Sequence, residues 1–307
     1  MEKGIRKSIA KFISLAIILL MAALIIKTRS SSDPFQNLLK YTESHKKTSP
    51  KIFFVGSSRM RMGIAVDQLE KIDSVRQFYN LGNNRSSILY NCRTAEKLIE
   101  VSPKNSLIYV ELSDLLITPP NQHQYFYSFE ESLEILKKHF ALRFSFAELN
   151  ELILQFFNFR LEIKNHFSDE ERILNEIEYY ADELNFHGGT SSIITQDDLT
   201  STSNDLTIFQ QKYLVMLRKV INRGKQKHIK VKFILPVTID KASERSQTLP
   251  IYKNIPATNK WIYSAAFLEK IHSDFFLRDL NHLNARGAHL HTLELFKDII
   301  ATTGSQF

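Results

Sequence analysis

This sequence has almost no cysteine, and it lacks the glycine-rich motifs that are typical of nucleotide-binding proteins. The 307 residues include a single cysteine, Cys92. A framework of internal disulfides and a zinc site built from cysteines are therefore excluded. The sequence also has neither a G-x-G-x-x-G fingerprint nor a G-K-[ST] phosphate loop. Nothing in it supports nucleotide chemistry, and we expect neither a cofactor nor a bound metal.

A basic surface that could bind nucleic acid is also missing. The chain has 40 Lys+Arg against 33 Asp+Glu, a formal net charge of +7. Residues 1–30 contain six basic side chains and one acidic one, which is +5 of that total. The other 277 residues contain 34 basic and 32 acidic side chains, a net charge of only +2. Because binding to phosphates needs clustered Lys and Arg, we expect no nucleic-acid partner.

One long apolar run is present, and it explains where the positive charge lies. Residues 12–26 read FISLAIILLMAALII, with Ser14 as the only polar side chain. Together with Ile9 and Ala10 the run is just long enough to cross a bilayer, and Lys11 can extend to the headgroups. Four basic residues precede the run and two follow it. Because positive charge is retained in the cytoplasm, we predict a cytoplasmic tail (1–8), a transmembrane signal-anchor (9–27) and a linker (28–49).

A cleaved signal peptide is the alternative, since its apolar region has a similar length. The segment MAALIIKTR offers no good cleavage site with small residues one and three positions before the cut. An uncleaved anchor is therefore favoured. Under either interpretation the rest of the chain is exported, so we expect a periplasmic or extracellular domain on a single-pass membrane protein.

From Pro50 onward the pattern is that of alternating strands and helices. Short apolar runs predict four buried strands, and helical spacing predicts helices over 86–101 and 206–223. Continuously apolar strands that are each followed by a helix indicate a parallel sheet covered on both faces, and functional groups gather at the carboxyl ends of such strands. The predicted strands are 52–55, 77–81, 106–112 and a run that ends at Pro236.

A segment of about 119–204 interrupts this alternation and has helical patterning of its own. It contains an aromatic stretch, Phe140–Phe159, a charged amphipathic stretch over 168–184, and a Gly/Ser/Thr-rich stretch over 187–204. The phenylalanines fit either the core of a small subdomain or an apolar face against the membrane. The core interpretation is the favoured one.

Two short motifs could carry chemistry. The first, Gly-Ser-Ser-Arg, follows the first strand and contains Ser57 and Ser58. The second, Asp-Leu-Asn-His-Leu-Asn-Ala-Arg-Gly-Ala, starts at Asp279 and contains His282. A serine at a strand-to-helix turn needs a base to become a nucleophile, and an Asp-x-x-His pair can fix an imidazole as that base. Each motif also has a common structural explanation, since serine at such a turn and Asn284 before the last helix are good N-caps.

Together and in this order, the two motifs resemble those of the SGNH/GDSL hydrolase superfamily. The second motif matches the family's last block, Asp-x-x-His-Leu-Asn-x-x-Gly-Ala, and Gly-Ser-Ser-Arg resembles the first block of its membrane-anchored branch, which is linked to acylation of cell-surface polymers. The resemblance covers about 51–116 and 231–300. It implies a three-layer, flavodoxin-like α/β domain over 50–307 with a parallel sheet and a helical insertion. It also implies Ser58 as nucleophile, His282 as base and Asp279 as the acid that orients it.

The blocks that supply the oxyanion hole in this family are altered. Counting from the Asn that opens the second block places Arg85 where a glycine is usual, and Gly82 lies three positions earlier. In the third block, Ser113 replaces the usual asparagine, and a hydroxyl can donate only one hydrogen bond. Asn83 and Asn84 are the further candidates for completing the hole.

The resemblance implies an enzyme that acts on acyl esters, either an esterase or an O-acyltransferase for envelope or exported polysaccharide. Transfer would require a multi-spanning membrane partner to deliver the acyl group. A catalytically degenerate domain that binds glycans or assists assembly is the alternative, because of the altered oxyanion blocks.

Other polar residues near the motifs have plainer explanations. We expect Arg59 and Arg61 to be solvated surface charges, although they could bind an anionic substrate. Glu111 and Asp114 are expected to hydrogen-bond the loops around the site. Two histidines that follow His282, His289 and His291, are expected at the surface and not as metal ligands.

Overall fold

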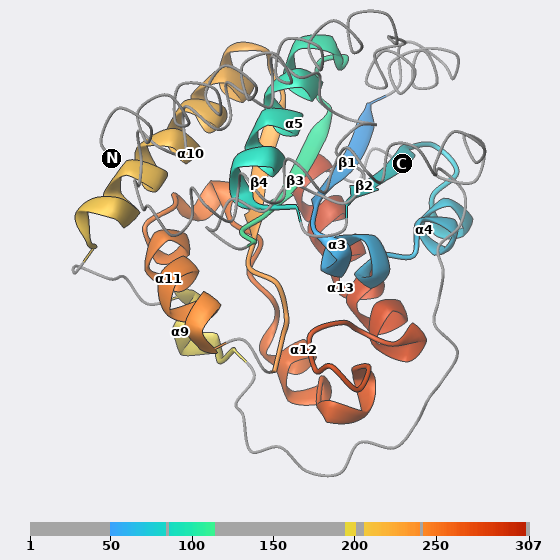
Figure 1. Cartoon of the computed structure of the whole chain (residues 1–307). Coiled ribbons are helices and arrows are strands. Elements are labelled where there is room, and N and C mark those ends of the chain that lie inside the picture. Colours follow the sequence, from blue (N-terminus) through green and yellow to red (C-terminus); the bar gives the residue numbers. More distant parts are fainter. Residues whose placement is uncertain (1–49, 84–85, 114–193, 201–205, 240–241, 305–307) are drawn as a thin grey trace, which may run out of the picture.

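The computed structural model describes residues 50–83, 86–113, 194–200, 206–239 and 242–304. These residues form an α/β structure around a four-stranded parallel sheet (Figure 1). In chain order the elements are β1 (Lys51–Gly56), α3 (Ser58–Gly63), α4 (Val66–Ile72), β2 (Gln77–Gly82), α5 (Ile88–Val101), β3 (Leu107–Glu111), α9 (Gln196–Thr200), α10 (Ile208–Gln226), β4 (Lys230–Ile234), α11 (Ala242–Lys253), η1 (Ala257–Asn259), α12 (Ala265–Lys270), η2 (Ser273–Phe275) and α13 (Ala285–Thr303).

The predicted parallel sheet is confirmed, and its strand order is β2-β1-β3-β4. This is the order of flavodoxin-like doubly wound sheets as far as the fourth strand. β1 lies in the middle, with Val55 opposite Leu81 of β2 and Val110 of β3. Every residue of β1 and β3 is buried. Such strands are apolar on both faces because helices cover both faces of the sheet.

Helices cover the two faces of the sheet. α5 and α10 pack together on one face, and α13 packs against α3 and α4 on the other (Figure 1). α10 begins with a capping box, in which Thr207 Oγ1 accepts from the N–H of Gln210 and the Gln210 side chain accepts from the N–H of Thr207. The described part of the chain therefore has three layers, with the sheet in the middle.

The last helix, α13, is held to the sheet by polar contacts as well as apolar ones. Asp298 accepts hydrogen bonds from Tyr109 Oη of β3 at 2.7 Å and from Lys232 Nζ of β4 at 2.6 Å. Burial lowers the pKa of Lys232, and the contact with Asp298 acts against that shift. At the other end of the helix, Asn284 is the N-cap, and its side chain accepts from the N–H of Gly287. The capping role considered for Asn284 is thus confirmed.

The element boundaries differ from the predicted ones by a few residues. β4 ends at Ile234 and not at Pro236, because proline has no N–H for the ladder. α5 begins at Ile88 and α10 extends to Gln226. None of the helices in these described ranges is long and apolar enough to span a membrane. The predicted tail, anchor and linker (1–49), most of the insertion (119–204) and Asp114 lie outside the described residues.

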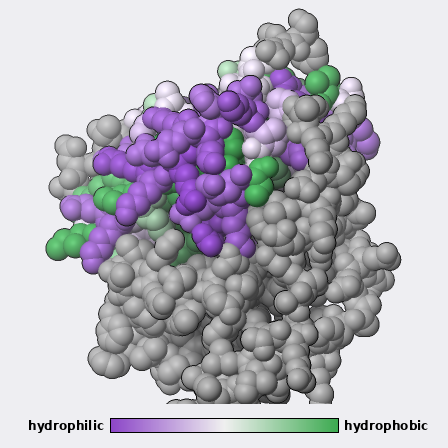
Figure 2. All heavy atoms as spheres, turned by 90° about the horizontal axis from the view of Figure 1, so that it is seen from above, coloured by the Kyte–Doolittle hydropathy of each residue, from purple (hydrophilic) through white to green (hydrophobic). Residues whose placement is uncertain are grey.

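The end of the molecule where the strands begin is strongly polar. Viewed from above, its described surface is largely hydrophilic (Figure 2). The last turn of α10 and the turn into β4 contribute exposed residues there, namely Arg223, Lys225, Lys227, His228 and Lys230. Arg223 pairs with Glu100 of α5 at 2.7 Å. The two predicted chemical motifs lie at the opposite end, where the strands finish.

Candidate active site

The turn after β1 is fixed by a buried carboxylate. Ser57 is the N-cap of α3, and its Oγ accepts from the N–H of Arg59 at 3.2 Å. Glu111, the last residue of β3, accepts from the N–H of Ser57 at 2.7 Å and from its Oγ at 2.8 Å. A Cβ on Gly56 would lie 2.4 Å from Glu111 Oε2, so only glycine allows this approach. Glu111 thus hydrogen-bonds the serine turn, as expected from the sequence.

The structure brings Ser58, His282 and Asp279 together at this carboxyl end of the sheet. Ser58 Oγ lies 2.7 Å from His282 Nε2. His282 Nδ1 is in close contact with Asp279 Oδ2, and Asp279 Oδ1 accepts from the N–H of His282 at 3.1 Å. A proton on Nδ1 that is donated to the carboxylate leaves Nε2 as the acceptor for the serine hydroxyl. The arrangement can therefore remove the Ser58 proton.

Hydrogen bonds to His282 and to backbone N–H groups hold Asp279 in its charged form. Partial burial by itself would raise the pKa of Asp279, but these contacts lower it to about 2. The charged carboxylate can stabilise an imidazolium on His282. Because 47% of the Asp279 side chain is exposed, solvent screens part of this interaction.

A short hairpin carries Asp279 and His282. The N–H of Leu277 donates to the carbonyl of His282 at 2.8 Å, and Phe276 is paired with Leu283 in an antiparallel bridge. Between the two functional residues, Leu280 has a φ of 52°, which is uncommon for leucine. Its side chain is buried and its carbonyl accepts from the N–H of Ile239. Burial and this bond hold the strained residue, and with it the turn that aims His282 at Ser58.

Arg59 is not the solvated surface charge that the sequence suggested. Its side chain is only 9% exposed and lies between Glu111 of β3 and Glu244 of α11. Nη1 and Nη2 bind the two oxygens of Glu244 at 3.0 and 2.7 Å, and Nε binds Glu111 at 2.9 Å. Burial by itself would lower the pKa of Arg59, but the two carboxylates raise it well above its usual value. The guanidinium therefore joins the serine turn to α11.

The residues predicted for the oxyanion hole have different surroundings. Gly82 ends β2, and a Cβ there would lie 2.3 Å from the backbone nitrogen of Arg61, so glycine permits close packing of α3 on β2. Asn83 follows, and its N–H donates to the carbonyl of Gly56 at 2.9 Å. Its side chain is buried, with neither Nδ2 nor Oδ1 bonded to a partner among the described residues. Asn84 and Arg85 lie outside the described residues.

The Ser113 hydroxyl both donates and accepts a hydrogen bond within the protein. Its Oγ donates to the carbonyl of Ser86 at 2.8 Å and accepts from Asn91 Nδ2 at 2.9 Å. Since a hydroxyl has one proton, Ser113 has none left for an oxyanion. It is a supporting residue that fastens the start of α5 to the end of β3.

His289 and His291, the two histidines of α13, differ in their exposure to solvent. His289 is exposed, as expected. The surface prediction was wrong for His291, which is buried against Trp261, Tyr263 and Phe267 and whose Nδ1 bonds the carbonyl of Gly63 at 2.9 Å. Its neighbours are apolar because α13 presents this face to the core. Within the described ranges no group of three or more His, Cys, Asp or Glu side chains could hold a metal ion.

Two polar residues of this region were missed by the sequence reasoning. Glu244 lies 185 positions after its partner Arg59, in a helix that no motif marks. Asn91 lies in the first turn of α5, and its side chain bonds Ser86, Ser113 and the carbonyl of Glu111. A polar residue on the buried face of a predicted helix, as Asn91 is, was the one available signal.

Comparison with models of protein families, with curated proteins and with solved structures finds no match to this chain. Function is therefore inferred from the geometry of the site and from the motifs themselves.

Proposed function

We propose that this chain is a membrane-anchored, extracytoplasmic serine esterase or O-acyltransferase of the SGNH type. The observation that carries the proposal is the line of contacts from Ser58 Oγ to His282 Nε2, at 2.7 Å, and from His282 Nδ1 to Asp279. The proposal is supported by the way these three residues, from two distant segments of the sequence, line up as nucleophile, base and acid.

The proposed reaction has two halves. Ser58 Oγ attacks the ester carbonyl while His282 Nε2 takes its proton, and the resulting oxyanion collapses as His282 protonates the leaving alcohol. The acyl group is then on Ser58. Water, or a sugar hydroxyl in the transferase case, gives its proton to His282 and attacks the acyl-serine. His282 then returns the proton to Ser58 Oγ as the bond to the acyl group breaks, which releases the acid or the new ester and restores the free serine. Asp279 stays charged and stabilises the imidazolium in both halves.

The oxyanion needs donors other than Ser113. Ser58 is the first residue of α3, and the first-turn N–H groups of a helix have no carbonyl of their own helix to bind. We assign the Ser58 N–H as one donor. The side-chain amide of Asn83, buried and without a partner among the described residues, is the second. Preorganised donors of this kind are commonly the largest single contribution to catalysis of acyl transfer.

A serine-directed fluorophosphonate tests the proposal. The wild-type chain is expected to be labelled, while Ser58→Ala and His282→Ala are not. Ser74→Ala, which removes an exposed serine next to β2, is the matched control and keeps full labelling. A folded wild-type chain that is never labelled would contradict the enzyme proposal and favour the alternative, a degenerate domain that binds glycans.

A second measurement is needed to distinguish hydrolysis of the ester from transfer of the acyl group to a glycan. Acylation of the cell's own glycans, compared between wild type and Ser58→Ala cells, reports transfer. Release of free acid from a model ester by the purified chain reports hydrolysis. An envelope or exported polysaccharide is the proposed acceptor, and a multi-spanning membrane protein is the proposed source of the acyl group.

A further inference from the structure

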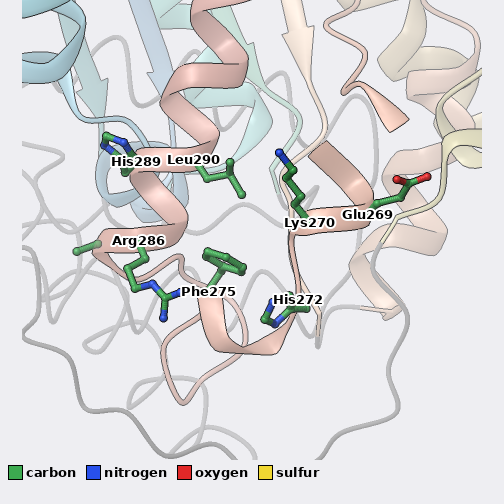
Figure 3. A pocket seen from close by; sticks show the side chains of 8 residues that line it. Glu269, Lys270, His272, Phe275, Arg286, His289 and Leu290 are labelled. Atoms are coloured by element: carbon green, nitrogen blue, oxygen red, sulfur yellow. The ribbon is translucent and has the colours of Figure 1, made fainter. Parts of the chain in front are cut away.

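A hollow adjoins the hairpin that carries Asp279 and His282. It has a volume of about 740 Å³ and lies between α12, η2 and the first turns of α13 (Figure 3). The N–H of Asn284 donates to the carbonyl of Phe275 at 2.9 Å and closes the base of the hairpin. Phe275 and Ala285, on either side of that base, both line the hollow. We call it the hairpin groove.

The walls of the hairpin groove are apolar and its edge is cationic. Phe275 and Leu290 are half-buried and form the walls, while Lys270 and Arg286 are exposed. Figure 3 shows the Phe275 ring between Arg286 and His272. The Arg286 guanidinium lies 5.2 Å from the centre of the ring, and the His272 ring 4.7 Å from it.

Among the described residues, the two permanent cations of the groove have no partner of opposite charge. Within the described ranges neither Lys270 nor Arg286 forms an ion pair, although the chain pairs many of its other charges. Glu269, the one carboxylate among the lining residues, points away from the Phe275 ring (Figure 3). Arg286 also occupies the first turn of α13, where the helix dipole disfavours a positive charge and where no acidic residue offsets it. The cations are thus available to an anion from outside.

We propose that the hairpin groove binds an acidic glycan, with one carboxylate at Arg286, a second at Lys270 and a sugar ring against Phe275 and Leu290 (Figure 3). A sugar ring has an apolar C–H face, which the apolar walls fit, and hydroxyls at its rim, which His272 and His289 can bind. A fatty acyl chain fits less well, because it needs an enclosed apolar channel and here the cations and histidines are exposed. The inference rests on the proposed function, since it gives the class of the polysaccharide acceptor: an acidic glycan.

Calorimetric titration of the full-length chain with tri-galacturonate tests the inference, with maltotriose as the neutral trimer and laurate as the acyl anion. We expect tri-galacturonate to bind and maltotriose to bind at least tenfold more weakly. Lys270→Gln and Arg286→Gln should each weaken the binding of tri-galacturonate about tenfold, because each removes a charged hydrogen-bond donor. Added salt should weaken it further, since exposed charges are screened. Lys219→Gln, an exposed lysine on α10 at the other face of the sheet, is the matched control.

Three results would overturn the inference: no binding of tri-galacturonate, equal binding of maltotriose, or the same affinity in the two charge variants as in wild type. Binding of laurate alone would also overturn it and would assign the groove to an acyl chain. Ser58→Ala should bind tri-galacturonate as wild type does. A chain that binds the trimer but is not labelled by fluorophosphonate would therefore refute the proposed enzyme and leave the groove standing, and the converse pattern would refute the groove alone.

Discussion

Arg59 and Glu244 form a bidentate ion pair that joins the turn of the candidate nucleophile to α11. The same guanidinium contacts Glu111, which holds Ser57 by its N–H and hydroxyl. The Arg59 side chain, next in sequence to Ser58, therefore joins α3 to both β3 and α11. Arg59 is a positioning residue in this arrangement, since it touches neither Ser58 Oγ nor His282 in the structure.

Loss of Arg59 should be costly for both stability and reactivity. Arg59→Met leaves the buried carboxylate of Glu111 and the partly buried one of Glu244 without their counter-ion, which we expect to lower the free energy of unfolding by about 3–5 kcal/mol. Glu244→Gln keeps the pair between Arg59 and Glu111 and should cost less. Urea denaturation measures the stability, and the rate of fluorophosphonate labelling of the folded protein measures the position of Ser58.

The matched control for Arg59 is Arg223→Met. Arg223 pairs with Glu100 at 2.7 Å, but the Arg223 side chain is 46% exposed. Exposed pairs contribute about 0–1 kcal/mol, so this variant should unfold and label almost as wild type does. Equal stability of Arg59→Met and Arg223→Met would contradict the role given to the buried cluster.

Asn83 offers a variant that should slow the proposed reaction without destabilising the fold. Its side chain is buried and neither polar atom has a partner among the described residues, so Asn83→Ala should not lower the free energy of unfolding. If the amide is an oxyanion donor, the same change should slow turnover of a model ester about 10²–10³-fold. Asn91→Ala is the control, because its side chain bonds Ser86, Ser113 and Glu111 and its loss should destabilise the fold. Unchanged turnover in a folded Asn83→Ala chain would remove Asn83 from the site.

Burial of His291 should make stability depend on pH. Burial lowers the pKa of His291 to about 4, while the bond to Gly63 and the charge of Glu294 act in the opposite direction. An unfolded histidine has a pKa near 6.5, so between about pH 6.5 and 4 the unfolded chain takes up a proton that the folded chain does not. The contribution of His291 is therefore fully present above pH 6.5 and decreases by about 3 kcal/mol as the pH falls to 4.

His291→Gln should flatten this part of the stability curve, since an amide can still donate to the carbonyl of Gly63 and does not titrate. Urea denaturation between pH 4 and pH 7 measures it. His289→Gln, two residues earlier on the exposed side of the same helix, should leave the slope unchanged. A His291→Gln chain with the slope of wild type would contradict the assignment of that slope to His291.

Glycine is required at the end of β2. A methyl group on Gly82 would lie 2.3 Å from the backbone nitrogen of Arg61, so α3 would have to shift away from the sheet. Gly82→Ala should destabilise the chain by about 1–3 kcal/mol, as overpacking does elsewhere. It should also slow labelling of Ser58, because Ser58 begins the helix that shifts. Gly63→Ala, where the nearest atom would lie at 3.7 Å, should change neither measurement appreciably.

The parallel sheet could be predicted from the sequence because strands buried on both faces are continuously apolar, as β1 and β3 are. Ser58, Asp279 and His282 could be singled out because their two short motifs together resemble the first and last blocks of the SGNH/GDSL hydrolases. The spacing alone did not distinguish Ser58 from Ser57. Arg59 and Glu244 could not be paired, since a contact between residues 185 positions apart leaves no local pattern. The burial of His291 likewise depends on which face of α13 meets the core.

The contact between Ser58 and His282 also has a consequence for synthesis, because 224 positions of the chain separate the two residues. Ribosomes make the serine turn first and the hairpin with His282 only after another 224 residues. Until that hairpin has been made and has docked, Ser58 has no histidine beside it. In the proposed enzyme, a product truncated before His282 could therefore not acylate its surroundings.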